Sequence, residues 1–462
     1  MEGRPDAVVT NLASYFPSPL TWTRSLGTLP PQLLEVLKKL EVIRAEREED
    51  LPMNSRERVR AAINHQEPDT IPIDLAGYFA SGMAAIAYRN LRDFLNLEKR
   101  PIRVYDPHQV LAVIDEDVLA RFGVDTAQAG RIFDQDDSCW KDGVLPDDTP
   151  CQYPIWASPE KHEGKWVLRS VTGKIVGHRP EGVLNFEPVN FPFAERDSLT
   201  VKDIRAAIDN FQFTGVAGPY TATLNLPDGS RQFGEAIRKL YESTDRAIIL
   251  PYGGHLLELG QWLYRADNFY MMMGAERART HEFLDRVVEI HLEELEKLLK
   301  YAGPYVDVVA LSEDLGGQQG PLVSMKMFRE FFKERHRTIW NRIRQFTNAK
   351  VMLHSCGAVS NLIPDLIEAG VDILNPIQID CPGMDVRKLK AEYGKDLLFW
   401  GGGCDTHRVL PFATPAEVQK HVREQVDLLR VGGGFVFQQV HNILADVPPQ
   451  NIVAMYEAVR QP

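Results

Sequence analysis

Two residues with metal-binding side chains stand close together in the second half of the chain. Residues 351–353 are apolar, and His354 and Cys356 follow them two positions apart in the sequence LHSCG. An imidazole and a thiolate suit Zn²⁺, and a catalytic zinc site takes about three protein ligands with one open position. Cys404 and His441 each follow a later apolar run, so either one could supply the third ligand. The alternative is a buried cysteine beside a histidine that satisfies a backbone group, but the two further candidate ligands favour zinc.

Acidic residues end other apolar runs and could handle protons or a substrate. Glu313 and Asp314 form an adjacent pair in LSEDLGG, and one side chain of such a pair on a strand points inward and the other outward. Asp314 could orient a ligand, bind a cationic group or carry a proton, and a helix or loop cap is the alternative role. Asp74 is a weaker candidate of the same kind. We therefore take Asp314, Glu313 and Asp74 as the candidate catalytic residues.

Five further residues at the ends of apolar runs are candidates for substrate binding, although each could simply close the loop that carries it. Three consecutive glycines precede Cys404, and glycine allows a ligand to approach the backbone closely. The candidates are Asn375, Gln378, Gly402, Asp405 and Asn442.

The remaining cysteines and histidines are expected to be structural. Cys139, Cys151 and Cys381 lie in loops or in a β-rich segment, with no histidine at ligand spacing. His65, His162 and His255 are expected to be ordinary surface or packing residues. An odd, sparse set of five cysteines is not a disulfide framework, so we expect reduced thiols and a cytoplasmic location.

The elements that must position these residues alternate regularly along the chain. From residue 247 onward, apolar strands alternate with amphipathic helices, which predicts a parallel sheet covered on both faces. Strands are expected within 247–254, 305–317, 349–359, 371–378, 397–403 and 434–443, and earlier within 69–77 and 124–130. Helices are expected at 55–66, 110–123, 268–303, 324–347, 360–370, 385–394 and 414–433. The pattern predicts a (β/α)8 barrel with its functional residues after the carboxyl ends of the strands.

Two segments depart from this alternation. Residues 1–54 are predicted to be an N-terminal extension with Pro-rich turns and one charged helix. Residues from about 134 to 190 alternate apolar and polar side chains around Gly and Pro turns, which predicts a β-rich insertion of one or two hairpins. The barrel is therefore assigned to residues 55–462, with this insertion inside it.

Composition excludes several classes of protein. The net charge of −12 argues against non-specific nucleic-acid binding. No apolar run is long enough for a transmembrane helix, and no secretory signal is evident at the N-terminus. No Gly-x-Gly-x-x-Gly sequence opens a helix, which disfavours a dinucleotide-binding sheet.

Five stretches together resemble the uroporphyrinogen decarboxylase superfamily. They are SRERVRAAINHQEPDTIPID, DLGGQQGPLVS, HSCGAVSNLIPDLIEAGVDILNPIQ, FWGGGCDTHRVLPFATPAEV and GGGFVFQQVHNILADVPPQNIVAMYEA. They span most of residues 55–460 in the order of the family, and the resemblance implies a (β/α)8 barrel.

The branch of the family follows from what two of these stretches contain. The haem-pathway decarboxylases carry arginines after the first strand to bind substrate carboxylates, whereas IDLAGYFAS at residues 73–81 has none. The chain is more similar to the corrinoid-linked methyltransferases, in which a His-x-Cys pair and a later cysteine hold zinc. His354 and Cys356 match the pair, while His441 stands at the later position, so His441 and Cys404 both remain candidates.

This resemblance implies a methyltransferase that works with zinc and with cobalamin on a partner corrinoid protein. No Asp-x-His-x-x-Gly corrinoid signature occurs in the chain, so the corrinoid is expected on a separate protein, and a homodimer is also implied. Methyl ethers, methylamines and thiols all remain open as substrates. The alternatives are a metal-free decarboxylase in which Asp74 or Asp314 holds the substrate acid, and a non-catalytic tetrapyrrole-binding protein.

Overall fold

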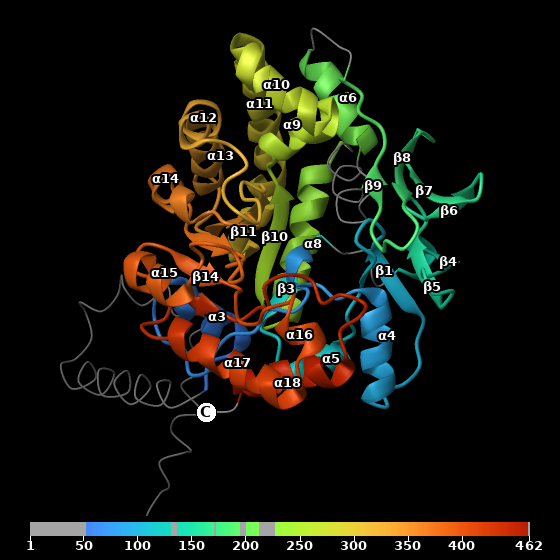
Figure 1. Cartoon of the computed structure of the whole chain (residues 1–462), viewed down its shortest axis with the longest axis vertical. Coiled ribbons are helices and arrows are strands. Elements are labelled where there is room, and N and C mark those ends of the chain that lie inside the picture. The colour runs from blue at the N-terminus through green and yellow to red at the C-terminus, as the bar shows by residue number, and fades with distance from the viewer. Residues whose placement is uncertain (1–51, 131–135, 171, 195–199, 212–226, 461–462) are drawn as a thin grey trace, which may run out of the picture. The chain divides into compact units, whose positions relative to one another are not determined.

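The computed structural model describes residues 52–130, 136–170, 172–194, 200–211 and 227–460 (Figure 1). The predicted N-terminal extension therefore lies almost entirely outside the described residues. Seven parallel strands form one sheet in the order β15-β14-β13-β12-β11-β10-β3. Their bounds are β3 Thr126–Gln128, β10 Ala247–Gly253, β11 Val308–Ser312, β12 Lys350–His354, β13 Ile373–Asn375, β14 Leu398–Trp400 and β15 Phe435–Val436.

An eighth extended segment, residues 72–74, closes this sheet into a barrel. We call each of the eight segments of the barrel wall a stave. Ile73 forms a parallel bridge with Phe437, just after β15, and the Asp74 amide donates to the Phe437 carbonyl at 2.8 Å. On its other side, the Ile73 carbonyl accepts from the Asp125 amide at 2.8 Å, just before β3. Residues 72–74 thus connect the two edges of the sheet, and the predicted (β/α)8 barrel is confirmed.

The two faces of the strands separate into two apolar clusters, because successive side chains on a strand point to opposite faces. The inner cluster fills the barrel and contains Ala247, Ile249, Val308, Ala310, Met352, Ile373, Leu398, Trp400 and Val436. The outer cluster packs against the helices and contains the alternate residues, among them Ile248, Leu250, Val309, Leu311, Val351, Leu353 and Phe399. Each strand position can therefore be assigned to the inside or the outside of the barrel.

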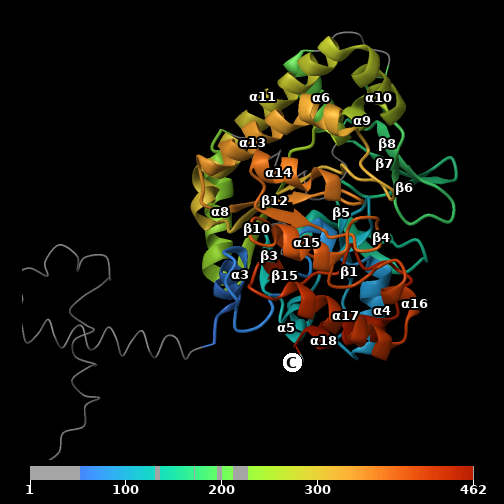
Figure 2. The same ribbon diagram turned by 60° about the vertical axis from the view of Figure 1, so that its left-hand side comes forward.

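Helices surround the sheet (Figures 1 and 2). Their bounds are α3 Ser55–Ile63, α4 Ala85–Phe94, α5 Glu116–Phe122, α6 Val201–Phe211, α8 Gly229–Ser243, α9 Leu257–Tyr264, α10 Ala266–Ala275, α11 Arg277–Ala302, α12 Met325–Met327, a π-helical turn η7 Phe328–Lys333, α13 Glu334–Arg344, α14 Ile363–Ala369, α15 Val386–Tyr393, α16 Val409–Phe412, α17 Pro415–Leu429 and α18 Pro449–Arg460. Capping boxes begin two of them, at Asn54 and Glu57 for α3 and at Thr414 and Glu417 for α17. Among the described residues, none of these helices combines the length and the apolar character needed to cross a membrane.

Two helix predictions were wrong in detail. The helix expected over 110–123 begins only at Glu116, because Leu111–Ala112 forms β2 and pairs antiparallel with β1, Ile102–Asp106. The helix expected over 268–303 is two helices, α10 and α11, which are interrupted at Glu276. In both cases an apolar run that suits a helix belongs partly to another element.

The segment between β3 and α6 contributes strands to two small sheets, the first of which also contains β1 and β2. One has the order β2-β1-β5-β4, with β4 Trp140–Val144 and β5 Pro150–Pro154 antiparallel. The other is antiparallel, with β6 Glu160–His162, β7 Lys165–Arg169, β8 Ile175–Arg179 and β9 Glu187–Pro188. Both views show these strands beside the barrel (Figures 1 and 2).

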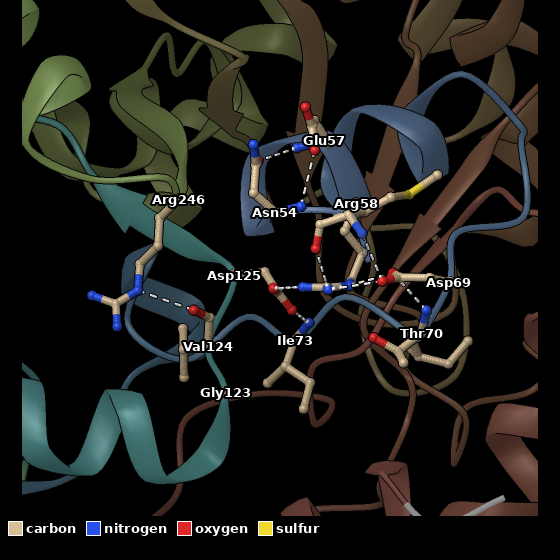
Figure 3. Close-up of polar contacts among 12 residues, drawn as sticks. Asn54, Glu57, Arg58, Asp69, Thr70, Ile73, Gly123, Val124, Asp125 and Arg246 are labelled. Atoms are coloured by element: carbon tan, nitrogen blue, oxygen red, sulfur yellow. Dashed lines mark hydrogen bonds and ion pairs between the residues drawn. The ribbon is translucent and has the colours of Figure 1, made fainter. Parts of the chain in front are cut away.

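Three aspartates stabilise the end of the barrel where the strands begin, and we call these contacts the aspartate clasps. Each aspartate follows a valine, immediately precedes or begins a strand, accepts a backbone amide from the neighbouring strand and pairs with an arginine. The three sets are Asp125 with the Ile73 amide and Arg58, Asp307 with the Ile248 amide and Arg60, and Asp372 with the Val351 amide and Arg344, at 2.6 to 2.9 Å. Figure 3 shows the first clasp, with Arg58 between Asp69 and Asp125. Charged groups at this face therefore serve the fold, and the chemistry must be sought at the other end.

Candidate metal centre

Polar side chains occupy the last inward positions of the strands. Val308 and Ala310 on β11 are followed inside the barrel by Ser312, and Met352 on β12 is followed by His354. Parallel partners share a face, so Ser312, His354 and Asn375 lie in register on the inner face at the carboxyl ends of three adjacent strands. The sequence thus changes from apolar to polar where each strand reaches the barrel mouth.

The contacts of Asn375 determine which nitrogen of the His354 ring carries the proton. The Asn375 Nδ2 group donates to the Trp400 carbonyl at 2.9 Å and to Gln438 Oε1 at 2.8 Å, so its Oδ1 must be an acceptor. This Oδ1 lies 2.7 Å from His354 Nδ1, which is therefore protonated. The lone pair of His354 then resides on Nε2, which faces the Cys356 sulfur at 3.4 Å.

His354, Cys356 and His441 form one group of candidate metal ligands. One ligand atom of each lies within 4.8 Å of those of the other two. The His354 and His441 rings are 5.6 Å apart between centroids, in a T-shaped arrangement. Within the part of the chain that the structure describes, these three side chains are the group of histidine, cysteine or acidic residues close enough together to hold one metal ion.

This donor set fits zinc. In a tetrahedral zinc site, a sulfur ligand atom and a nitrogen ligand atom lie about 3.6 Å apart. The Cys356 sulfur and His354 Nε2 are 3.4 Å apart, which is close to this value. Burial, together with the nearby His354 and His407, lowers the pKa of His441 to about 3, so its imidazole is neutral and can ligate. Burial, Asp314 and Glu258 raise the pKa of Cys356 well above its usual range, which a bound cation would reverse.

The structure brings His441, and not Cys404, into this group. Cys404 is fully buried in the outer cluster, and its sulfur points to the Asp405 carbonyl at 3.8 Å. Burial and the Asp405 carboxylate raise the pKa of its thiol. Cys404 is thus placed as a small core residue, and the choice between the two candidates favours His441.

The acidic pair divides between two functions, as its alternation on the strand predicts. Glu313 is buried, and its carboxylate accepts the amides of Leu256, Leu257 and Glu258 at 2.6 to 3.1 Å, so it caps the N-terminus of α9. Burial and the nearby Glu258 raise the pKa of Glu313 to about 8, against the effect of the three amides. Asp314 instead lies at the mouth with 41% of its side chain exposed, 3.8 Å from His354 Nε2, and accepts the Cys356 amide at 2.8 Å.

Sequence reasoning missed an acid and a histidine beside Asp314. Glu258 Oε2 accepts the Asp314 amide at 3.0 Å and lies 2.9 Å from His255 Nδ1. His255 was predicted to be an ordinary surface or packing residue; in the structure it contacts Glu258, and Glu258, Glu313 and Asp314 raise its pKa although burial lowers it. The signal in the sequence was the spacing of His255 and Glu258, one helical turn apart directly after a strand.

Asp74 lies deep inside the barrel and is fully satisfied by protein donors. It accepts from the Gly77 amide, from the Thr126 hydroxyl at 2.7 Å and from the Trp400 indole at 2.8 Å. Burial raises its pKa while these hydrogen bonds lower it. Asp74 thus joins three staves across the barrel and sits below the mouth.

Four of the five predicted substrate-binding residues mainly order the loops of the mouth. Gln378 accepts the Gly357 amide at 2.7 Å, and Asn442 accepts the Gly82 amide at 2.8 Å. Asp405 accepts the amides of His407 and Arg408, and Gly402 has a positive φ of 81°. The fifth, Asn375, orients the candidate ligand His354.

Two aromatic rings also flank the candidate ligand His354, those of Tyr78 at 5.8 Å and Phe79 at 5.6 Å between centroids.

The fold and the site define a (β/α)8-barrel protein with a candidate metal centre at its mouth. Residues 259–462, which carry all three candidate ligands, match the family described as Uroporphyrinogen decarboxylase (URO-D). The family resemblance read from the sequence is confirmed.

Comparison with solved structures agrees with the fold. A methyltransferase from Methanosarcina mazei superposes with a TM-score of 0.52 at 15% identity, covering 88% of this chain and 98% of that one. Two glycosidase structures are more distant. A β-glucosidase mutant derived from a hyperthermophilic tetrameric structure has a TM-score of 0.39 at 10% identity, covering 86% and 96%. The β-glycosidase from Thermosphaera aggregans has a TM-score of 0.35 at 12% identity, covering 84% and 96%. No curated protein sequence matches the chain.

Proposed function

We propose that this protein is a zinc-dependent methyltransferase that moves a methyl group between a small substrate and the cobalamin of a separate corrinoid protein. The substrate would give up or receive the methyl group at a heteroatom, as in a methyl ether, a methylamine or a thiol. The observation that carries the proposal is the convergence of His354, Cys356 and His441 at the mouth, with the His354 lone pair oriented toward the Cys356 sulfur. The likeness to a methyltransferase structure supports the same choice within the family.

The three side chains would hold zinc with one position open to the substrate. Bound zinc supplies Lewis acidity, which lowers the pKa of a thiol or polarises the heteroatom that bears the methyl group. Asn375 would keep the His354 ring in the ligating tautomer. The half-exposed carboxylate of Asp314 would orient the substrate or carry its proton, while Glu258 holds the Asp314 backbone in place.

The charge at the mouth disfavours the alternative of a decarboxylase acting on a substrate with many carboxylates. Such a substrate needs cationic partners, and bidentate arginine is the usual one. The stretch after the first stave, residues 75–81, contains no arginine or lysine, and the carboxylates of Asp314 and Glu258 lie together at the mouth. These carboxylates would repel a polyanion.

Metal analysis of the purified full-length protein under reducing conditions tests the first part of the proposal. We expect about one zinc per chain in the wild type and its loss in His354→Ala, Cys356→Ser and His441→Ala. Cys404→Ser is the matched control, since this thiol is buried outside the group, and it should retain zinc. Wild-type protein without stoichiometric zinc would refute the metal centre.

Methyl transfer itself is tested with cob(I)alamin, whose absorbance falls when the cobalt takes up a methyl group. A methyl ether, a methylamine and a methyl thioether are offered in parallel, and zinc-depleted protein is the control. Turnover that needs zinc supports the proposal. Release of CO2 from a carboxylic acid without any corrinoid would instead support the decarboxylase.

A further inference from the structure

One buried side chain at the barrel mouth has no partner. Gln128 is the last residue of β3 and is 8% exposed, and neither its Oε1 nor its Nε2 atom forms a hydrogen bond. A buried carboxamide with both ends unsatisfied is rare in native proteins, because it gives up its bonds to water without replacement. Such a group requires an explanation that the fold does not provide.

The alternation along β3 directs this side chain into the barrel. Thr126, two residues earlier, points inward and donates to Asp74. Gln128 is in register with Ile249 of β10, which belongs to the inner cluster. The carboxamide therefore lies on the inner face, one position closer to the mouth than the layer of Thr126 and Asp74.

Several other inward polar side chains of the mouth are paired with one another. Asn375 binds Gln438, and Gln438 in turn donates to the Ala80 carbonyl at 3.1 Å. Thr126 and Trp400 both bind Asp74. Gln128 is left out of these networks, so its unused donor and acceptor are available to a molecule bound in the mouth.

We propose that Gln128 positions the substrate by binding a neutral substituent that both donates and accepts a hydrogen bond, such as a hydroxyl group. This inference rests on the proposed function, because it places the methyl-bearing heteroatom at the metal centre. Strands β10 and β11 separate β3 from β12, which carries His354, so the two groups stand on well-separated staves of the mouth. The substrate is then bifunctional, with the methyl group at one end and the hydroxyl group at the other.

The acidic residues of the mouth specify the charge of that substituent. Asp314 and Glu258 follow β11 and β10, the strands nearest to β3 on this side. A carboxylate on the substrate would be repelled there, whereas a hydroxyl group would not. Gln128 would thus select neutral substrates over acids of the same shape.

The unfolding temperature of the ligand-free protein tests whether Gln128 contributes to the stability of the fold. Gln128→Met removes both polar ends at similar volume, and the unfolding temperature should stay the same or rise. Gln438→Met is the matched control, because this buried glutamine uses both ends and its replacement should lower the unfolding temperature by several degrees. An equal fall in Gln128→Met would show a structural role and overturn the proposal.

Binding of two probes of the same shape tests recognition. The probes are 4-methoxyphenol and 4-methylanisole, which differ by a hydroxyl and a methyl group, and titration calorimetry or ligand-observed NMR gives their affinities for zinc-loaded protein. The wild type should prefer 4-methoxyphenol about tenfold, and Gln128→Met should bind the two equally. Wild-type protein without this preference, or one that binds neither probe, would overturn the proposal, as would a preference that survives in the variant.

A failure here can be told apart from a failure of the proposed function. Zinc content does not depend on Gln128, because the three candidate ligands lie on other staves. Stoichiometric zinc with no probe preference would reject only the role of Gln128. Missing zinc together with a preference for 4-methoxyphenol that Gln128→Met abolishes would reject the methyltransferase and retain the binding site.

Discussion

Replacing Asn375 by alanine should weaken zinc binding although this residue does not itself contact the metal. The change removes the acceptor that holds the His354 Nδ1 proton at 2.7 Å, so the ring loses its fixed tautomer and orientation. Partners of metal-bound histidines usually contribute 10- to 100-fold in affinity, which corresponds to about 1.4 to 2.7 kcal/mol. We therefore expect zinc affinity to fall by about this factor.

The same change should also lower the free energy of unfolding. It leaves the Trp400 carbonyl and Gln438 Oε1 without the donors they have at 2.9 and 2.8 Å. A buried group left unsatisfied costs about 1 to 3 kcal/mol, so a total loss of about 3 kcal/mol is expected for metal-free protein. Urea unfolding of protein stripped with a chelator measures this loss, and competition with a zinc-binding dye at constant pH measures the affinity.

A matched control separates these two effects. Asn451 is buried on α18 and donates to two carbonyls, those of Leu410 and Ala413, at 2.9 and 2.8 Å. Asn451→Ala should cost similar stability and leave zinc affinity unchanged, while Asn375→Asp keeps the acceptor for His354 and should bind zinc at least as well as the alanine variant. The reasoning fails if Asn375→Ala binds zinc like the wild type, or if Asn451→Ala weakens zinc binding equally.

Three further predictions concern pH, the clasps and the loop of Cys356. Burial lowers the pKa of His336 to about 3 in the folded protein, whereas its pKa in the unfolded chain is near 6.5. As the pH falls from 7 to 5, the unfolded chain therefore binds a proton at His336 and the folded chain does not. His336→Phe should therefore gain about 2 kcal/mol relative to the wild type between pH 7 and pH 5 in urea unfolding, and a difference that does not change with pH would contradict this. Asp125→Ala should cost about 3 to 5 kcal/mol, because it removes a buried carboxylate that pairs with Arg58 and Arg460 and accepts the Ile73 amide. Asp69→Ala, at the more exposed end of the same network, should cost about 1 kcal/mol or less, and equal losses would refute the clasp. Gly357→Ala should lower both stability and zinc content, because the φ of Gly357 is 87° and a Cβ atom there would lie 2.5 Å from the Gly316 backbone. Gly173→Ala is the control: its φ is 82° but the space around it is open, so it should cost only about 1 to 2 kcal/mol and retain zinc. An equal loss of zinc in both variants would contradict a role of the Cys356 loop in metal binding.

The barrel could be predicted because its strands are buried on both faces. A short apolar run followed by polar residues indicates both the strand and its carboxyl end, and this located His354, Asn375 and Glu313 correctly at strand ends. A strand was predicted within residues 69–77, but the sequence does not show that it closes the barrel by contacting residue 437 on one side and Asp125 on the other. Its place follows from contacts with residues far away in the sequence.

The choice of third ligand lay beyond the sequence for a similar reason. Cys404 and His441 both follow strands, but glycines 401–403 break the alternation, so the direction of Cys404 cannot be read from Trp400. Gln128 was missed because β3 is only three residues long and polar at both ends. Gln128 is notable because its buried carboxamide lacks hydrogen-bond partners, which only the folded structure reveals.

The aspartate clasps have a consequence for how the barrel is divided. Each clasp joins two consecutive staves, the first to the second, the third to the fourth and the fifth to the sixth, so the fold consists of quarter-barrels. In the last quarter, β14 with β15, glycines 432–434 precede the second strand at the place where the other quarters have the aspartate. His354 and Cys356 come from the third quarter and His441 follows the fourth. A metal ion bound by these three residues would therefore link the unclasped quarter to its neighbour at the mouth, as the clasps link the others at the base.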